Sequence, residues 1–235
     1  MIKDLWLAFN IIISTIIFSI LISITGLFDT KKQITGKLIQ LWAKWILYSS
    51  FIKYRIDGLD NIDKKKYYVI ISNHQSAMDV ILTFALLPKP ISFFTKKELF
   101  YIPLFGWAMH SAGMVKVDRF NKSKSKKCVD DAIEKYTKTM LSFLVYPEGT
   151  RTSYDKLHEF KKGGFIFAIE ANAEILPLTI IYDKNDSSKL RSDVTLLVDS
   201  PISTLNYNFE QKDDLIVKIK NIIKSNLQKH IDANI

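Results

Sequence analysis

The feature that most constrains this chain is an uncharged stretch near its N-terminus. Residues 5–28 contain no Asp, Glu, Lys or Arg and consist mainly of Ile, Leu and Phe. About 20 apolar residues in a helix are enough to cross the hydrocarbon core of a bilayer. The stretch is longer than the roughly 7 to 15 apolar residues of a secretory signal, and no small-residue cleavage site follows it. The sequence therefore predicts a membrane-attached helix, and both a crossing and a re-entrant segment satisfy the pattern.

The charges around this stretch indicate on which side of the membrane the rest of the chain lies. Lys31, Lys32 and Lys37 follow the stretch, whereas only Lys3 precedes it. Cytoplasmic flanks of membrane helices carry an excess of Lys and Arg. We therefore expect the remainder of the chain on the cytoplasmic face.

A second helical pattern, amphipathic rather than uniformly apolar, covers residues 38–52. Its apolar side chains fall near one helical stripe: Leu38, Leu41, Trp42, Trp45, Ile46 and Ile52. Lys44 in the middle of the segment favours the headgroup region of a membrane over the bilayer centre. Packing of the same stripe on the soluble part is the alternative. In both interpretations residues 1–55 form an attachment module of two helices, and residues 56–235 form a separate domain.

The composition restricts the partners of the chain. Lys and Arg number 33 against 24 Asp and Glu, a net charge of +9, and 48% of the residues are hydrophobic. Such a chain is not intrinsically disordered, and it favours anionic partners such as a phospholipid surface or a nucleic acid. The aromatic residues lie largely in apolar segments, which argues against nucleic acid. A single cysteine, Cys128, excludes an internal disulfide and a thiolate metal cluster.

After Gly58 the pattern changes to short apolar runs separated by polar loops. These runs, expected to be strands, are residues 67–72, 91–95, 113–117, 141–146, 175–181 and 194–198. Helical patterns lie between or after them, at residues 79–87, 126–140, 163–171 and 212–229. Alternation of strands and helices predicts an α/β domain with a mixed, largely parallel sheet flanked by helices.

One histidine follows a predicted strand and has an acid close by in the sequence. His74 comes directly after the run 67–72, and Asp79 lies five positions further on. Five helical residues turn by about 140°, so the side chains can meet only if His74 stands in the loop and Asp79 in the first turn of the next helix. The carboxylate could then fix the imidazole tautomer and leave a ring nitrogen as a base. The alternative is an acid favoured only by the helix dipole.

The base needs something to act on. The sequence contains no Gly-x-Ser-x-Gly elbow, and Cys128 is far from His74 in the chain. A protein nucleophile is therefore not indicated, and the base is expected to act directly on a hydroxyl of the substrate.

Several cationic residues follow other predicted strands. Residues 145–151 read Val-Tyr-Pro-Glu-Gly-Thr-Arg, in which Gly149 permits a positive φ and Arg151 offers a planar fork suited to phosphate. Arg119 and Lys97 stand near two further strand ends. Taken alone, each of these groups is better explained as an ordinary turn or surface charge. Together with the His/Asp pair they indicate a site for an anionic substrate.

These motifs, in this order, resemble the glycerolipid acyltransferases and specifically the 1-acylglycerol-3-phosphate (lysophosphatidate) acyltransferase family. The matching blocks are Asn73-His74-x4-Asp79 and residues 113–119, 146–151 and 175–178. Residues 96–106 are also similar to bacterial members. The resemblance covers about residues 55–185. Tyr146 stands where the family usually has Phe, and Lys116 interrupts a normally apolar block.

The resemblance implies a role for each matching residue. His74 would be the base and Asp79 the acid that orients it. The residues lining the pocket for the glycerol phosphate would be Lys97, Arg119, Glu148, Gly149, Thr150 and Arg151. Asn73 and Pro147 belong to the motifs, and Pro177 would mark the block on the acyl-donor side.

The resemblance also implies the reaction and its setting. A fatty acyl group would pass from acyl-CoA or acyl carrier protein to the free sn-2 hydroxyl of lysophosphatidic acid, forming phosphatidic acid in phospholipid biosynthesis. No metal or other cofactor is expected, and the partner surface would be a phospholipid membrane, in bacteria the inner membrane. Two alternatives are an acyltransferase for another lysophospholipid and a non-catalytic lipid-binding protein, which would not need the His74–Asp79 pair.

Overall fold

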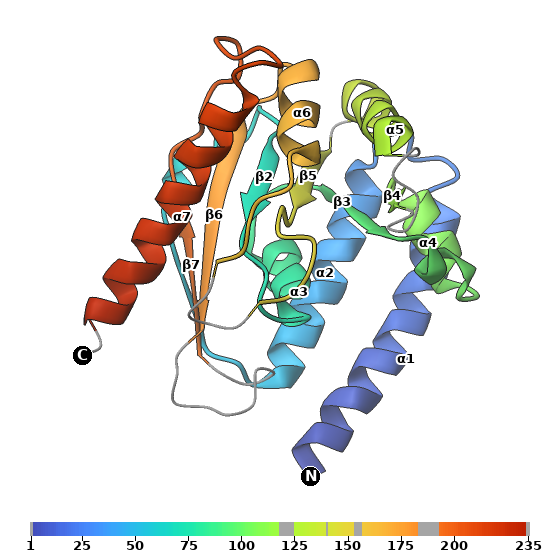
Figure 1. Cartoon of the computed structure of the whole chain (residues 1–235). Helices are drawn as coiled ribbons and strands as arrows, with labels where there is room; N and C mark the ends of the chain where they lie inside the picture. Colours follow the sequence, from blue (N-terminus) through green and yellow to red (C-terminus); the bar gives the residue numbers. More distant parts are fainter. Residues whose placement is uncertain (1, 118–124, 140, 153–156, 183–192, 234–235) are drawn as a thin grey trace. The chain divides into compact units, whose positions relative to one another are not determined.

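The computed structural model describes residues 2–117, 125–139, 141–152, 157–182 and 193–233 of the chain (Figure 1). Its α-helices are α1 (Ile2–Thr25), α2 (Gln33–Ser50), α3 (Met78–Leu86), α4 (Phe105–Ser111), α5 (Ser125–Lys138), α6 (Gly163–Glu170) and α7 (Lys212–Ala233). Short 3-10 helices are η1 (Leu59–Asn61) and η2 (Lys97–Tyr101). The strands are β1 (Tyr54–Asp57), β2 (Val69–Ser72), β3 (Ile91–Lys96), β4 (Val115–Val117), β5 (Ser142–Val145), β6 (Ile175–Tyr182) and β7 (Val194–Val198).

The strands form a mixed sheet. Among the described residues its order is β1-β7-β6-β2-β5-β3-β4. Strand β1 pairs with β7, β2 with β6, and β3 with β4 in parallel, whereas β6 and β7 are antiparallel. The predicted mixed, largely parallel sheet with flanking helices is therefore confirmed.

The strongest sequence patterns became elements close to their expected limits. Every predicted apolar run contains a strand, and each predicted helix has a counterpart. Strand β1 and helix α4 were not expected. The sequence of β1, Tyr-Arg-Ile-Asp, has no apolar run because the strand lies at the edge of the sheet and half of its residues are exposed.

The chain divides into two compact units, which are described separately. The first contains residues Met1–Phe51 and Val80–Phe143, and the second contains Ile52–Asp79 and Leu144–Ile235. Helices α1 and α2 therefore group with the segment from α3 to α5, a grouping that differs from the expected division at residue 55. We call these the helical unit and the sheet unit.

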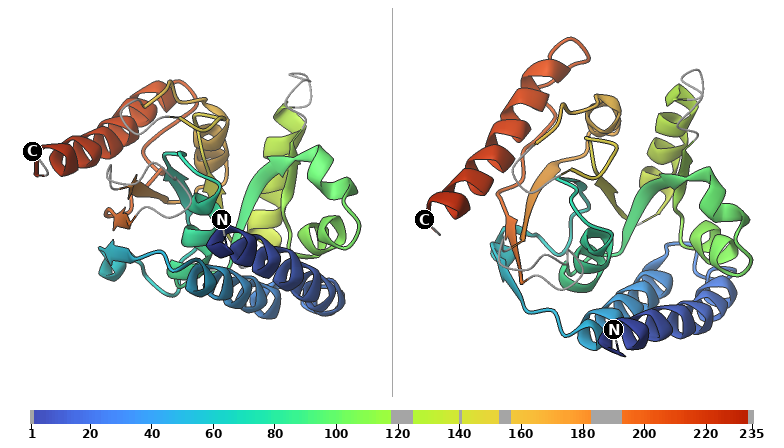
Figure 2. Two further views of the ribbon diagram at one scale, coloured as in Figure 1. Left: turned by 90° about the horizontal axis from the view of Figure 1, so that it is seen from below. Right: turned by 60° about the horizontal axis from the view of Figure 1, so that its bottom comes forward.

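In the helical unit, α1 and α2 form a hairpin, and the two helices run side by side in Figures 1 and 2. The Asp29 carboxylate braces the turn between them, accepting hydrogen bonds from the backbone amides of Gln33 (3.1 Å) and Thr35 (2.7 Å). These bonds satisfy amides at the start of α2, which have no partner within the helix. The indole of Trp42 on α2 donates to the Thr15 hydroxyl on α1 (3.3 Å).

Much of the apolar surface of this hairpin is exposed. On α1 the exposed side chains include Leu5, Phe9, Ile13, Ile17 and Ile24, and on α2 they include Leu41, Trp45 and Tyr48. Within the described residues, the segment Leu5–Thr25 is the one helix long and apolar enough to cross a membrane, judged by length and composition. The unit also contains an apolar pocket of about 120 Å³, lined by side chains from α1, α2, α3, β3 and α4 and by Ala112 and Met114.

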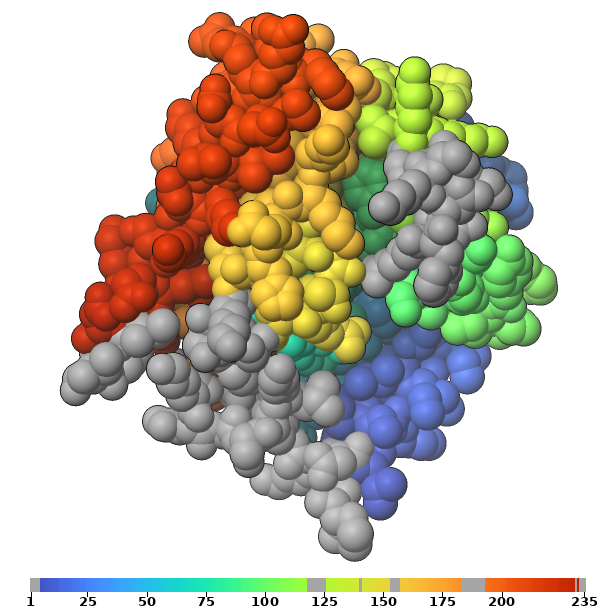
Figure 3. All heavy atoms as spheres, viewed as in Figure 1, coloured from blue at the N-terminus to red at the C-terminus, as the bar shows by residue number. Residues whose placement is uncertain are grey.

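In the sheet unit, β2 and β6 are the buried centre. All residues of both strands are buried, as expected for continuous apolar runs, and they pair in parallel from Val69 with Ile175 to Ser72 with Leu178. Helices α6 and α7 pack against each other, and their atoms adjoin on the face shown in Figure 3. The residues that follow β2 therefore extend from a strand that is buried in the centre of this unit and paired with β6.

Pro177 lies inside β6, a position that proline usually disfavours. Its carbonyl accepts a hydrogen bond from the Asp199 amide (3.1 Å), on the side of β7. The N–H and C=O of one strand residue point to the same side, so the N–H that proline lacks would also face β7. Pairing of β6 with β2, which supports the loop carrying His74, therefore loses no hydrogen bond.

Candidate active site

The side chains of His74 and Asp79 meet in the loop between β2 and α3. Strand β2 ends at Ser72 and α3 begins at Met78, so His74 stands in the loop and Asp79 in the first turn of the helix. The distance from His74 Nδ1 to Asp79 Oδ2 is 2.7 Å. This is the arrangement that the spacing of five residues required for the two side chains to touch.

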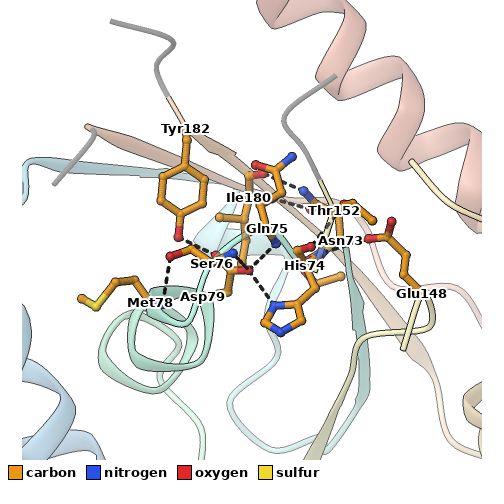
Figure 4. A network of polar contacts seen from close by, with 11 residues as sticks. Asn73, His74, Gln75, Ser76, Met78, Asp79, Glu148, Thr152, Ile180 and Tyr182 are labelled. Carbon is orange, nitrogen blue, oxygen red and sulfur yellow. Dashed lines mark hydrogen bonds and ion pairs between the residues drawn. The ribbon is translucent and has the colours of Figure 1, made fainter. Parts of the chain in front are cut away.

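Asp79 is fully buried, and several hydrogen bonds hold its carboxylate (Figure 4). Oδ2 accepts from the backbone amides of Gln75 (2.7 Å) and Ser76 (2.9 Å) in addition to its contact with His74. Oδ1 accepts from the Tyr182 hydroxyl at 2.5 Å. A carboxylate can be buried in this way because donors replace the water it has lost.

These bonds determine which ring nitrogen of His74 carries the proton. Oδ2 accepts from two backbone N–H groups and therefore also acts as the acceptor toward the imidazole. Nδ1 must then donate, so the neutral ring carries its proton on Nδ1 and its lone pair on Nε2. Because the side chain of His74 is 15% exposed, the arrangement provides a base at the surface of the sheet unit.

A second segment, residues 146–152, holds His74 by its backbone and by its ring. The His74 amide donates to Glu148 Oε1 (3.0 Å), and the His74 carbonyl accepts from the Thr152 amide (2.9 Å) and hydroxyl (3.2 Å). The Tyr146 ring stacks on the imidazole, with 4.1 Å between ring centroids and 14° between planes. The third sequence block therefore determines where the imidazole stands.

Glu148 has a role in this segment that the sequence did not suggest. Its side chain is buried, and its second oxygen, Oε2, accepts from the His158 amide (2.9 Å). Both carboxylate oxygens of Glu148 thus accept hydrogen bonds from backbone N–H groups, one from His74 and one from His158. The expected contact of Glu148 with a substrate phosphate stays a prediction, whereas its bracing of the His74 loop is part of the structure.

Asn73 fastens the other side of the loop to the sheet. Its side-chain amide donates to the Ile180 carbonyl and its side-chain oxygen accepts from the Ile180 amide, both at 2.8 Å. This pair continues the β2–β6 ladder one residue beyond Ser72. Asn73 therefore positions the residue that follows it, which is His74.

The turn that follows Glu148 brings the remaining predicted residues to the surface. Gly149 has a φ of 71°, a backbone conformation that residues with a Cβ rarely adopt, so glycine is favoured at this position. Pro147 is buried, whereas Thr150 and Arg151 are exposed. The next residue, Thr152, binds the His74 carbonyl. Thr150 and Arg151 therefore directly precede the residue that binds the His74 backbone, and both are accessible to a ligand.

Two predicted residues lie outside the described part of the sheet unit. Lys97 begins η2 in the helical unit. Arg119 lies outside the described residues. Cys128 also belongs to the helical unit, where its thiol donates to the Lys116 carbonyl (3.4 Å).

Residues that sequence reasoning missed are Thr152 and Tyr182. Thr152 directly follows the motif ending at Arg151, and its neighbourhood was the available signal. Tyr182 is 103 residues from Asp79 in the chain, so no local pattern could have linked them. As for metals, no group of three or more His, Cys, Asp or Glu residues suited to an ion occurs in the described part of the chain.

We predict that Glu148→Gln destabilises the protein without any substrate present. The amide of Gln offers one acceptor and one donor group, so either the His74 or the His158 amide would lose its acceptor, at a cost of about 1–3 kcal/mol in the free energy of unfolding. Thermal unfolding of the ligand-free protein in detergent measures this cost. Glu170→Gln, at an exposed position of α6 in the same unit, is the control and should shift stability by less than about 0.5 kcal/mol. Unchanged stability of Glu148→Gln, with a raised KM for a phosphate-bearing substrate, would instead assign Glu148 to the ligand.

Comparison with known proteins gives a consistent assignment. A family model described as Acyltransferase matches residues 53–181, more than half of the chain. The 1-acyl-sn-glycerol-3-phosphate acyltransferase LPAT1, chloroplastic, of Arabidopsis thaliana is 34% identical over 157 residues, which are 66% of this chain and 43% of that protein. The 1-acyl-sn-glycerol-3-phosphate acyltransferase of Saccharomyces cerevisiae is 27% identical over 224 residues, covering 91% of this chain and 72% of the yeast protein. The chain thus spans less than half of the plant relative and nearly three quarters of the yeast relative.

The fold is also similar to a solved structure. The crystal structure of the 1-acyl-sn-glycerophosphate (LPA) acyltransferase PlsC from Thermotoga maritima superimposes with a TM-score of 0.78 at 22% sequence identity, covering 97% of this chain and 94% of the other. At this identity the likeness concerns the fold. The match of the family model over residues 53–181, which include His74 and Asp79, establishes that the chain belongs to the acyltransferase family.

Proposed function

We propose that this protein is a 1-acylglycerol-3-phosphate O-acyltransferase, which transfers a fatty acyl group from acyl-CoA or acyl carrier protein to the free sn-2 hydroxyl of lysophosphatidic acid. The observation that carries the proposal is the His74–Asp79 contact, which leaves Nε2 of His74 as a base. The names of the plant and yeast relatives support the acceptor. The product is phosphatidic acid, and the pathway is phospholipid biosynthesis.

The proposed reaction needs no nucleophile from the protein. Nε2 of His74 takes the proton of the acceptor hydroxyl as its oxygen attacks the thioester carbonyl carbon and a C–O bond forms. The tetrahedral intermediate then collapses, the C–S bond breaks, and the leaving sulfur takes the proton from His74. Asp79 stabilises the imidazolium between the two proton transfers. Because a thioester is already activated, this sequence of steps proceeds without a cofactor.

Residues after the Gly149 turn are suited to the phosphate of the acceptor. Arg151 is exposed and stands directly before Thr152, whose amide and hydroxyl bind the His74 carbonyl. A guanidinium binds a phosphate through two parallel hydrogen bonds, which would hold the acceptor hydroxyl near the base. Gly149 and Thr150 supply backbone and hydroxyl groups in the same turn. We assign Arg119 and Lys97 to the same substrate on the strength of the motifs that contain them.

The hairpin α1–α2 is the proposed membrane attachment. Its exposed apolar side chains would otherwise face water, and the net charge of +9 attracts the protein to anionic headgroups. A lipid substrate that stays partly in the bilayer avoids a transfer cost of about 0.8 kcal/mol per CH₂. The apolar pocket of the helical unit offers space for part of a fatty chain. The Lys residues after α1 favour the cytoplasmic face, which in bacteria is that of the inner membrane.

Replacement of the base is the first test. His74→Ala keeps the backbone groups that Glu148 and Thr152 bind, and it should lower kcat by about 10²–10⁴-fold because the general base is lost. Purified protein in detergent is assayed with lysophosphatidic acid and other lysophospholipids, and with acyl-CoA and acyl carrier protein donors. His110→Ala, an exposed histidine of α4 in the helical unit, is the control and should keep full turnover. Retained turnover in His74→Ala contradicts the base assignment, and a preference for another lysophospholipid replaces the proposed acceptor.

Replacement of the guanidinium tests the phosphate site. Arg151→Ala should raise KM for lysophosphatidic acid by about 10- to 100-fold, the value of a charge-assisted hydrogen bond, and leave KM for acyl-CoA unchanged. Steady-state kinetics with each substrate varied in turn separate the two effects. The control is Lys218→Ala, which removes an exposed cation of α7 in the same unit. Equal changes in both KM values argue against a role in acceptor binding.

Membrane attachment predicts the behaviour of charged variants of α1. Ile13 and Ile17 are exposed, and replacing both with Asp should abolish binding to vesicles of phosphatidylglycerol and phosphatidylethanolamine, because each charge in the apolar region costs about 2.5–3.5 kcal/mol. Vesicle flotation measures the bound fraction. Val217→Asp, at an exposed apolar position of α7, should float as the unmodified protein does. Flotation of the double variant at the same level contradicts attachment through α1.

A further inference from the structure

Tyr182 is the last residue of β6. Its side chain contacts Asp79, the acid of the catalytic pair, although the two residues are far apart in the sequence. Its side chain is buried, with 3% of its surface exposed, and its hydroxyl donates to Oδ1 of Asp79 at 2.5 Å. In Figure 4 the phenol and the imidazole approach the carboxylate from different directions. The bond to Oδ1 links Tyr182 to His74 through the Asp79 carboxylate, whose other oxygen contacts the imidazole.

The two carboxylate oxygens of Asp79 accept hydrogen bonds from different groups. Oδ2 receives the His74 ring and the amides of Gln75 and Ser76, whereas Oδ1 receives the Tyr182 hydroxyl. Rotation of a carboxylate about its Cβ–Cγ bond moves both oxygens together. A donor on Oδ1 therefore fixes the plane of the group and, with it, the direction in which Oδ2 faces Nδ1 of His74.

The direction of the Tyr182 bond is fixed by its surroundings. Burial, and then the negative charge of Asp79, raise the pKa of Tyr182 far above its usual range. The raised pKa favours the protonated phenol, which acts toward Oδ1 as a donor. A hydrogen bond to a charged group is shorter and stronger than one between neutral groups, in agreement with the 2.5 Å separation.

Strand β6 supports the loop at two points. Ile180 binds Asn73, the residue before His74, and Tyr182, two residues further along the same strand, binds Asp79. The imidazole is thus carried by a loop whose two ends are tied to neighbouring positions of one buried strand. Displacement of either tie would move the acid relative to the base.

We infer that Tyr182 is a positioning residue, whose hydroxyl orients the Asp79 carboxylate so that His74 keeps its proton on Nδ1 and its lone pair on Nε2. The inference rests on the proposed function for its kinetic consequence. Its structural consequence, the tautomer of His74, does not depend on any substrate.

The test is Tyr182→Phe, which removes the hydroxyl and keeps the ring that fills the core. We expect kcat to fall about tenfold or more, the value of one charge-assisted hydrogen bond, with KM for acceptor and donor each within about twofold. In protein labelled with ¹⁵N-histidine, the Nδ1 and Nε2 resonances of His74 should move toward one another as the Nδ1–H tautomer loses its preference. Comparison with His74→Ala identifies the resonances of His74.

The matched control is Tyr68→Phe in the same unit. Tyr68 is 1% exposed, and its hydroxyl accepts a hydrogen bond from the Asp63 amide (3.0 Å). This bond does not involve His74 or Asp79. Its replacement also removes one buried hydroxyl, so the melting temperature should fall by a similar amount. A loss of stability alone therefore appears in both variants, whereas the changes in kcat and in the His74 resonances should appear only in Tyr182→Phe.

The outcomes separate the inference from the proposed function. Unchanged His74 resonances and kcat in Tyr182→Phe overturn the inference, as does a loss of kcat that Tyr68→Phe reproduces. If the unmodified protein transfers no acyl group to any lysophospholipid, the proposed function fails. In that case the inference stands or falls on the ¹⁵N spectra, since the tautomer is read without turnover.

Discussion

The hydrogen bond between His74 and Asp79 is the interaction on which the rest of the sheet unit depends. It joins a loop residue to the first turn of α3, and it requires a carboxylate to remain in a place that water does not reach. Two backbone amides and one phenol take the place of that water. Because an unpaired buried carboxylate is costly, the loop is stable only in the conformation that brings these donors together, which is also the conformation that exposes the base.

The architecture around this pair explains why the family blocks are spread along the chain. His74 follows the end of β2, its backbone groups bind Glu148 and Thr152, and its loop is joined to β6 by hydrogen bonds of Asn73. Some residues of a block that resembles a substrate-binding motif in the sequence thus form hydrogen bonds within the protein. In the third block this division is clear: Glu148 is buried and bonded to backbone amides, while Arg151 is exposed and available to a phosphate.

The helical unit carries the exposed apolar surface on which the proposed membrane attachment rests. A soluble protein rarely leaves so many large apolar side chains of two adjacent helices exposed, and the hairpin α1–α2 combines this surface with a strongly basic composition. Attachment to an anionic bilayer satisfies both properties.

The sequence by itself determined most of the elements and the pairing of His74 with Asp79, because these depend on local patterns. Apolar runs predicted the strands, and the spacing of His74 and Asp79 predicted how the two could meet. Tertiary structure alone decided what holds them: Tyr182 lies 103 residues from Asp79, and Glu148 lies 74 residues from His74. The orientation of a buried carboxylate is set by donors from distant strands, and strand pairing, unlike helical periodicity, leaves no trace in local spacing.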